Sequence, residues 1–301
     1  SGHVMRCRTL ARELMRRGAE IIFVCRRQPG DMINIVKKEF EVLCLPEQQL
    51  TSCSGLKGRN LYNAWLGCSQ EEDAKQCIEL LSKYNIREPM WLVIDHYGLS
   101  RPWHEHLLAS YGSRIKTPKL LVIDDLADRI HKADLLLDQN FYGINTNKRY
   151  KNLVPTHCSQ LLGPHYALLD ENYTKLHPLI PERKEIRRVL VFFGGVDQEN
   201  LTCRSIQALM DPALAHLAVD VVVGLQTPHR KIVEELVAHR PHTTLHSSLP
   251  SLAGLISRAD LAIGAGGTTT WERSCLRLPS LVIAIAENQI QISKALSNAG
   301  F

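Results

Sequence analysis

The chain alternates short apolar runs of β type with helical stretches, and it does so in two successive series. Strands that alternate with helices favour a parallel sheet covered by those helices. We therefore predict an α/β protein with two doubly wound Rossmann-like domains that face a cleft. The predicted strands are 21–25, 41–46, 91–97, 120–125, 133–140, 189–195, 219–225, 261–267 and 280–286, and the clearest predicted helices are 4–17, 71–84 and 229–239.

The segment 177–187 is rich in proline and charge and separates the two series, as a linker would. The 301 residues fit two domains of roughly 150 residues each. We therefore predict an N-terminal domain over 1–177 and a C-terminal domain over 178–301. The sequence opens inside a helical pattern and stops where a helix would end on Gly300. We expect a first strand to precede Ser1 and the second domain to be cut short.

Composition excludes several classes of protein. Apolar residues make up 45% of the chain and the net charge is +5, with lysines and arginines scattered rather than gathered in a stripe. This pattern predicts a folded protein without a nucleic-acid surface. No apolar run reaches the ~18 residues of a membrane span. The nine cysteines contain no C-x-x-C pair, which favours free thiols in a reducing cytoplasm over a zinc site. The sequence specifies no oligomeric state.

Two glycine-rich segments follow predicted strands of the second series. In GAGGTTTWE (264–272), Gly266 and Gly267 let the backbone approach a ligand, and Thr268 and Thr269 add hydroxyls at the start of a helix. This segment has the features of a phosphate-binding loop, although it lacks the lysine of a Walker loop. Glu272 lies in the first helical turn, where it could accept hydrogen bonds from a ribose. A tight turn with capping threonines is the alternative interpretation.

The segment FFGGVD (192–197) repeats this logic with Gly194 and Gly195 at the first strand of the same series. On its own it is equally consistent with a plain turn. Two glycine-rich loops at strand ends of one domain support each other, because ligands of parallel sheets bind at the carboxyl ends of the strands.

His3 lies at the start of the first predicted helix. The positive end of a helix dipole disfavours an imidazolium, so a histidine at this position is suited to accept a proton. The alternative is that Ser-Gly-His is the remnant of an expression tag.

Polar residues end two predicted strands of the first series: Asp95, His96 and Tyr97 after one, and Asp124-Asp125 after the other. Three interpretations remain open for them, namely a divalent metal site, a set of hydrogen-bonding groups for a sugar, and capping of loops and helices. We favour the absence of a metal.

Seven motifs occur in an order that resembles one enzyme family. They are GHVMRCRTLA (2–11), IDHYG (94–98), IDD (123–125), GPHYALL (163–169), FFGG (192–195), GAGGTTTWE (264–272) and ENQ (287–289). Together they resemble the UDP-sugar hydrolases of pseudaminic acid biosynthesis, which release UDP from UDP-2,4-diacetamido-2,4,6-trideoxy-β-L-altropyranose. Those enzymes are similar to the MurG-type glycosyltransferases and share the GT-B fold. The resemblance covers nearly the whole chain.

The resemblance implies a role for individual residues. His3 matches the catalytic base, Tyr97 and Asn288 match residues on the sugar side, and Glu272 matches the acid that holds the ribose. The glycine-rich segment before Glu272 matches the diphosphate loop, and no cofactor is implied. The implied reaction is attack of water on the anomeric carbon with release of UDP. A MurG-like glycosyltransferase and a non-catalytic UDP-sugar-binding module are the two alternatives, because fold alone does not decide function.

Overall fold

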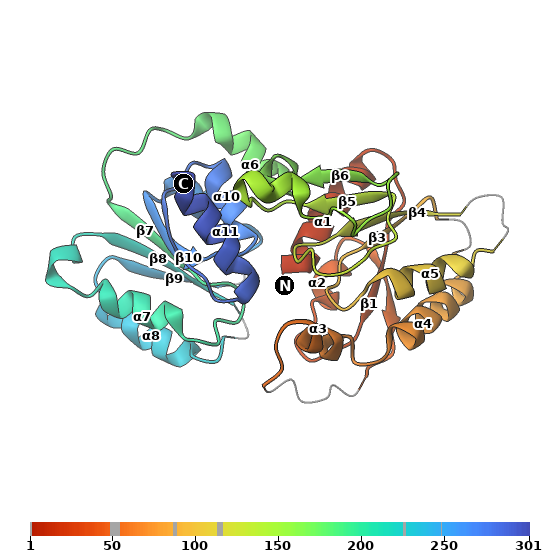
Figure 1. Cartoon of the computed structure of the whole chain (residues 1–301). Helices are drawn as coiled ribbons and strands as arrows, with labels where there is room; N and C mark the ends of the chain where they lie inside the picture. The colour runs from red at the N-terminus through yellow and green to blue at the C-terminus, as the bar shows by residue number, and fades with distance from the viewer. Residues whose placement is uncertain (1, 49–54, 87–88, 113–116, 225–226, 248) are drawn as a thin grey trace. The chain divides into compact units, whose positions relative to one another are not determined.

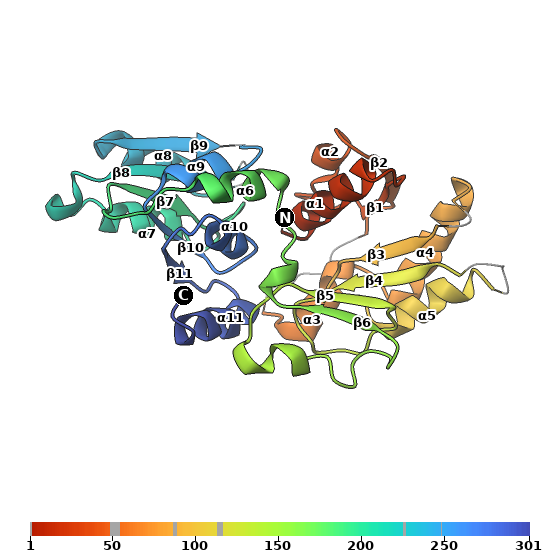
Figure 2. The same ribbon diagram turned by 90° about the horizontal axis from the view of Figure 1, so that it is seen from above.

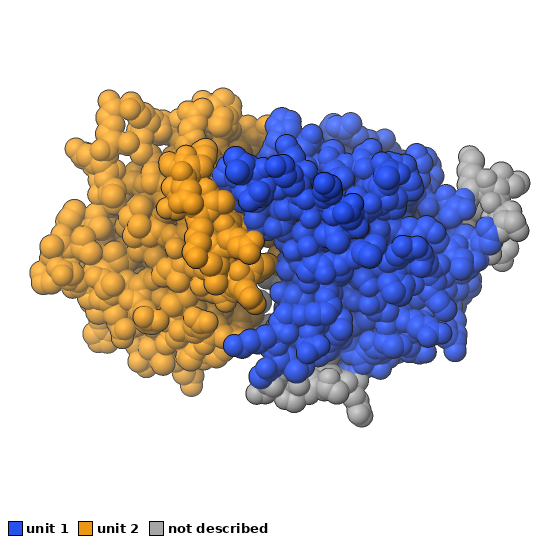
Figure 3. Space-filling model, in the orientation of Figure 1, with its two compact units in different colours: residues 1, 3–168 blue, residues 2, 169–301 orange. Residues whose placement is uncertain are grey.

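The computed structural model describes residues 2–48, 55–86, 89–112, 117–224, 227–247 and 249–301. The chain forms two compact units, residues 3–168 and 169–301 (Figure 3). The predicted boundary at 177/178 therefore lies nine residues after the observed one. The reason is that helix α6 (Glu171–Leu176), which precedes the linker, packs its Tyr173 into the core of the second unit.

The first unit contains two parallel sheets. Strands β1 (Ile22–Arg26) and β2 (Glu41–Leu45) form a two-stranded sheet. Strands β3 (Trp91–Ile94), β4 (Lys119–Ile123), β5 (Leu135–Asp138) and β6 (Ser159–Leu162) form a four-stranded sheet in chain order (Figure 2). The helices of this unit are α1 (Gly2–Arg16), α2 (Ile33–Val36), α3 (Gly58–Leu66), α4 (Gln70–Lys83) and α5 (Arg101–Ala109), with 3₁₀ turns η1 (Gly143–Lys148) and η2 (Pro164–Tyr166).

Alternating side chains of β4 divide the core of the first unit between two faces. Leu120 and Val122 pack with α4 and α5, whereas Leu121 and Ile123 pack on the other face beside Cys7 of α1. This is the two-residue period of a strand that is covered on both sides. Helix α1 also packs its Ala11 against the β1–β2 layer. As a result, the residues at the start of α1 lie near the carboxyl ends of β3 and β4.

The second unit contains a single five-stranded parallel sheet of order β11-β10-β7-β8-β9 (Figures 1 and 2). Its strands are β7 (Arg188–Phe192), β8 (Ala218–Val223), β9 (Thr243–Ser247), β10 (Leu261–Ala265) and β11 (Ser280–Ile283). Its helices are α6, α7 (Leu201–Ala208), α8 (Arg230–His239), α9 (Ala253–Arg258), α10 (Thr269–Cys275) and α11 (Glu287–Asn298), with 3₁₀ turns η3 (His177–Leu179) and η4 (Pro212–Leu214).

The two faces of this sheet are covered by different helices. Val189 and Val191 of β7 pack with α7 and α8, whereas Leu190 packs with α9, α10 and Tyr173 of α6. Every predicted strand and helix of both series is present with its ends shifted by a few residues, so the predicted α/β architecture is confirmed. Residue 225, the last of one predicted strand, lies outside the described residues.

In the described part of the chain the cysteines are free thiols, and Cys53 lies outside it. Within the same ranges, no helix combines the length and the apolar character needed to cross a membrane.

Candidate active site

The candidate base of the first unit is held by a buried carboxylate. The Nδ1 atom of His3 lies 2.5 Å from Oδ1 of Asp95, whose side chain is almost fully buried, while a third of the His3 side chain is exposed. A carboxylate at Nδ1 holds the imidazole in one orientation and in the tautomer that leaves Nε2 free to accept a proton. The structure therefore brings together two of the predicted residues in the arrangement of an oriented general base.

Arg6 links the carboxylates that follow two neighbouring strands. It lies one helical turn after His3 and donates to Asp95 from Nε (2.7 Å) and Nη2 (2.6 Å). Its Nη1 atom donates to both oxygens of Asp125, at 2.8 and 2.9 Å. Sequence reasoning did not assign Arg6 a role, although its spacing of three residues from His3 places both side chains on one face of the helix.

The charges of this network support each other. Burial alone would raise the pKa of Asp95, but its interactions with the His3 and Arg6 side chains lower it well below its usual range. Burial works against the charge of Arg6 in the same way, and the facing Asp125 and Asp95 carboxylates raise its pKa instead. A buried guanidinium between two carboxylates is an expensive arrangement unless each donor is matched, as it is here.

Tyr97 joins the hydrogen-bonded network of His3, Arg6, Asp95 and Asp125 through its hydroxyl. The side chain is buried, and its hydroxyl donates to Oδ2 of Asp125 at 2.5 Å. Its ring contacts the edge of the His3 ring, with centroids 4.4 Å apart. Asn140, which sequence reasoning missed, donates to Oδ1 of Asp125 at 3.2 Å. In this structure Tyr97 thus supports the position of His3 from one side.

His96 and Asp124 have structural partners close by. Nδ1 of His96 accepts the backbone N–H of Gly98 at 3.0 Å, and burial lowers the pKa of His96 to about 4. Asp124 is fully buried, accepts the N–H of Ala127 at 2.9 Å and pairs with Arg129 at 2.7 Å. Both residues shape the loops that carry the site.

The carboxylates of this site are engaged by protein donors. The oxygens of Asp95 and Asp125 already accept bonds from Arg6, His3 and Tyr97. A divalent ion would have to displace those donors and approach a buried guanidinium. Across the described ranges, no three His, Cys, Asp or Glu side chains are arranged to hold a metal ion.

In the second unit, the glycines of the predicted phosphate loop have different structural roles. A Cβ at Gly264 would lie 2.4 Å from the carbonyl oxygen of Phe192, and one at Gly266 would lie 3.0 Å from Oγ of Ser293 in α11. A Cβ at Gly267 would meet nothing closer than 3.8 Å. Close packing of the protein explains the first two glycines but not Gly267, which is partly exposed at the start of the turn into α10.

The other predicted glycine loop is also sterically restricted. Gly194 has φ +98°, a conformation that favours glycine. The carbonyl of Gly195 approaches Gly224 so closely that a Cβ on Gly224 would lie 1.8 Å from it. Asp197, which follows, caps α7 by accepting the N–H groups of Leu201 and Thr202, both at 2.9 Å.

The carboxyl group of Glu272 has a raised pKa and an oxygen atom without a hydrogen-bond partner. Burial raises its pKa to about 7, and a hydrogen bond with Tyr173 and the charge of Arg273 oppose the rise only in part. Its Oε2 atom is buried and has no hydrogen-bond partner in the structure. A buried oxygen without a donor is rare in folded proteins and is suited to accept a bond from a bound hydroxyl. Tyr173 was not singled out from the sequence, because no motif surrounds it.

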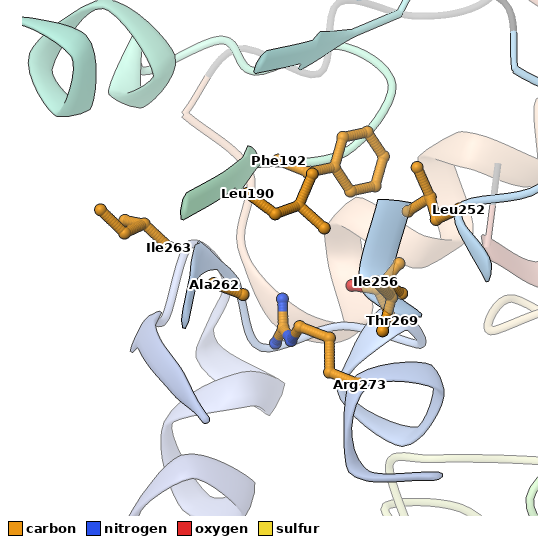
Figure 4. A pocket seen from close by; sticks show the side chains of 8 residues that line it. All are labelled: Leu190, Phe192, Leu252, Ile256, Ala262, Ile263, Thr269 and Arg273. Atoms are coloured by element: carbon orange, nitrogen blue, oxygen red, sulfur yellow. The ribbon is translucent and has the colours of Figure 1, made fainter. Parts of the chain in front are cut away.

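A small recess lies beside the glycine-rich turn between β10 and α10 (Figure 4). It has room for no more than about one water molecule, far less than a typical ligand pocket. Arg273 enters it from α10 and donates to the carbonyl of Ala265 at 2.9 Å. The lining residues are Leu190, Phe192, Leu252, Ile256, Ala262, Ile263, Thr269 and Arg273. The recess is mainly apolar, so it supports the loop and does not accommodate a nucleotide.

The structure therefore groups the predicted residues in two sets. His3, Asp95, His96 and Tyr97 lie together in the first unit. In the second, Gly266, Gly267, Thr268 and Thr269 form the turn between β10 and α10, and Gln289, next to Asn288 in α11, lies near Gly267. Asn288 itself is partly exposed at the start of α11.

Comparison with known proteins agrees with this architecture. No protein-family model matches the chain. Over 139 residues it is 28% identical to the spore coat polysaccharide biosynthesis protein SpsG of Bacillus subtilis, covering 46% of this chain and 41% of that protein. It is 23% identical over 298 residues to the uncharacterized protein MJ1062 of Methanocaldococcus jannaschii, covering 96% and 54%. The chain thus spans about half the length of these curated relatives.

Solved structures define the fold class. MurG of Acinetobacter baumannii superposes with a TM-score of 0.54 at 14% identity, over 100% of this chain and 81% of MurG. UGT89C1 of Arabidopsis thaliana superposes with a TM-score of 0.60 at 11% identity, over 97% of this chain and 79% of UGT89C1. The chain has the GT-B fold of two Rossmann-like domains, as predicted.

Proposed function

We propose that this protein is a sugar-nucleotide enzyme that hydrolyses a UDP-sugar to UDP and free sugar. The observation that carries the proposal is the bond between His3 and the buried Asp95, which provides an oriented base on the first unit. A GT-B protein solved with UDP-L-rhamnose and the relation to a polysaccharide biosynthesis protein support a UDP-sugar as the ligand. The motif resemblance favours UDP-2,4-diacetamido-2,4,6-trideoxy-β-L-altropyranose, of pseudaminic acid biosynthesis, as the substrate.

In the proposed reaction, Nε2 of His3 removes a proton from water as the oxygen of that water attacks the anomeric carbon. The bond between the anomeric carbon and the β-phosphate oxygen breaks, and both of its electrons leave with UDP. Backbone N–H groups around Gly267 and Thr268 stabilise the diphosphate charge. Direct attack by water inverts the configuration at the anomeric carbon. No step requires a nucleophilic side chain.

Glu272 completes the nucleotide site in this proposal. Its unpartnered Oε2 atom accepts a hydrogen bond from a ribose hydroxyl. Asn288 contacts the sugar from α11, as the resemblance implies.

Release of UDP without any acceptor tests the proposal. The purified protein is incubated with UDP-2,4-diacetamido-2,4,6-trideoxy-β-L-altropyranose and with UDP-N-acetylglucosamine, and UDP is quantified by chromatography. We expect release from the wild type and from His157→Asn, a control at an exposed histidine of the same unit. His3→Asn is expected to lose about 10²–10⁴-fold in rate. Turnover that appears only after an acceptor sugar is added would show a glycosyltransferase instead.

A further inference from the structure

A buried hydrogen-bonded cluster is formed by the residues that follow β4 and the last residue of β5. Its centre is the hydroxyl of Tyr150, whose side chain is fully buried. This hydroxyl lies 3.0 Å from the backbone oxygen of Asp124, 3.0 Å from Oδ2 of Asp124 and 3.1 Å from Oδ2 of Asp138. Asp124 and Asp138 are 0% and 2% exposed, so these contacts are shielded from bulk water.

The contacts of Tyr150 require one more proton than two ionised aspartates supply. A phenol has a single proton to donate. When it is directed at Asp124, that proton is shared between two acceptors of one residue. The contact with Asp138 then brings a phenol lone pair and a carboxylate oxygen together with no hydrogen between them, which is unfavourable in a buried site. A proton on Oδ2 of Asp138 removes this conflict, because the acid then donates to Tyr150.

The other neighbours of the two carboxyl groups indicate which of them holds the proton. Asp124 pairs with Arg129 at 2.7 Å and also accepts a backbone N–H at 2.9 Å, as suits an ionised carboxylate. Asp138 accepts the N–H of Asn140 at Oδ1, at 3.0 Å. The Nε atom of Arg149 lies 3.2 Å from Oδ2 of Asp138, but within the described part of the chain it forms no hydrogen bond. Asp138 is therefore the acid that carries the proton.

The charges around Asp138 agree with this assignment. Burial, then the charge of Asp125 and to a smaller extent that of Asp124, raise the pKa of Asp138 to about 7. The charge of Arg149 and the accepted backbone N–H oppose this rise only in part. Burial also raises the pKa of the neighbouring Tyr142, so this phenol adds no charge. Below about pH 7 the surroundings of Asp138 favour the neutral acid.

Asp138 is connected to the candidate base through Asn140. The backbone N–H of Asn140 donates to Asp138, and its side-chain amide donates to Oδ1 of Asp125 at 3.2 Å. Asp125 in turn accepts bonds from Arg6, which also binds the carboxylate beside His3. A second charge at Asp138 would repel Asp125 and so act on the groups that orient the imidazole.

We propose that Asp138 is a positioning residue that works as a neutral acid, donating its proton to Tyr150 and holding Asn140 in place. Asn140 then fixes Asp125, on which the orientation of His3 depends. This inference rests on the proposed function and adds a regulation of the same site by pH. When Asp138 loses its proton, Tyr150 stands between two carboxylates and the alignment of the candidate base is lost.

Urea unfolding tests the proton without any substrate, on the wild type, Asp138→Asn and the matched control Asp124→Asn at pH 5 and pH 8. An acid whose pKa is raised by folding loses its stabilising neutral form as the pH rises through about 7. The urea midpoint of Asp138→Asn should therefore rise relative to that of the wild type between the two pH values. Folding lowers the pKa of Asp124, so Asp124→Asn should have a lower midpoint than the wild type by a similar amount at both. A difference for Asp138→Asn that does not change with pH would overturn the proposal.

Infrared spectroscopy gives a signature that a merely structural role would not change. The carbonyl stretch of a protonated carboxylic acid is separate from the bands of a carboxylate. The difference spectrum of wild type minus Asp138→Asn should contain this acid band at pH 6 and lose it at pH 9. The corresponding difference spectrum for Asp124→Asn should lack it at both. Absence of the band from the Asp138→Asn difference spectrum at pH 6 would refute the neutral acid.

The pH profile of UDP release tests the link between Asp138 and the candidate site. A general base alone gives a kcat/KM that rises with pH to a plateau. We expect kcat/KM of the wild type to fall about tenfold by pH 8, because an acid with a pKa of about 7 is then mostly ionised, and this fall should be absent from Asp138→Asn. Parallel profiles in two active proteins would refute the positioning role while hydrolysis stands. If neither protein releases UDP, hydrolysis fails, and unfolding and infrared spectra alone decide on the neutral acid.

Discussion

Replacing Glu272 by glutamine should stabilise the protein and weaken its affinity for the nucleoside at the same time. Burial raises the pKa of Glu272 from 4.5 to about 7. A carboxyl whose pKa is raised by folding contributes stability as the neutral acid below about pH 4.5, and loses it as the pH rises through about 7. At pH 8 the folded protein therefore carries an ionised carboxylate that costs it unfolding free energy.

The size of this cost follows from the two pKa values. A pKa difference of one corresponds to about 1.4 kcal/mol, so a rise from 4.5 to about 7 means that ionisation lowers the free energy of unfolding by at most about 3.5 kcal/mol. Glutamine has nearly the same shape and does not ionise. Urea unfolding should therefore show that Glu272→Gln gains stability relative to the wild type between pH 5 and pH 8. An equal difference at both pH values would contradict the assigned pKa.

The same substitution should impair binding of the ribose. A hydrogen bond to a charged group contributes about 1.5–3 kcal/mol, which corresponds to about ten- to a hundredfold in affinity. Uridine is the appropriate ligand for calorimetry, because it has no phosphate that titrates in this range. Wild-type affinity for uridine should rise as the pH increases through about 7, whereas that of Glu272→Gln should not. Unchanged affinity in the variant at pH 8 would refute the ribose assignment.

Four other perturbations test other parts of the structure. Gly267→Ala should leave the free energy of unfolding nearly unchanged but weaken UDP binding by about tenfold or more, as calorimetry with UDP would measure. Gly264→Ala should destabilise the protein by about 1–3 kcal/mol in urea unfolding, because the added Cβ has no room. Asp125→Asn leaves the buried Arg6 partly unpaired and should lower stability by about 3–5 kcal/mol, measured by urea unfolding. EDTA should leave the rate of UDP release unchanged, because protein donors already occupy the carboxylates of the site; complete loss of activity that magnesium restores would contradict this.

Local patterns were sufficient to predict the layers of the fold. The apolar runs around β4 and β7 are strands because alternate side chains face helices on both sides of the sheet. The turn at Gly266 and Gly267 was predictable for a similar reason, since glycines between a strand and a helical pattern indicate a tight connection. The domain boundary was misplaced because a proline-rich segment marks a change in composition, whereas packing of Tyr173 decides which unit α6 joins.

The contacts within the site join residues that are far apart in the sequence, and a local sequence pattern does not indicate which distant residues will meet. Arg6 joins carboxylates 89 and 119 residues away, and only the strand order brings them together. Likewise, the sequence does not indicate that Gly264 is required by a carbonyl of β7, whereas Gly267 has open space around it. The ring contact between His3 and Tyr97 likewise joins residues that are far apart in the sequence.

The destination of the oxygen atom of water tests the central claim most directly. The reaction is run with the UDP-sugar in water enriched in heavy oxygen, and both products are weighed by mass spectrometry. Attack at the anomeric carbon with His3 as base predicts label in the free sugar, none in UDP, and a rate that falls about 10²–10⁴-fold in His3→Asn. Label in the nucleotide, or normal turnover by His3→Asn, would contradict the mechanism.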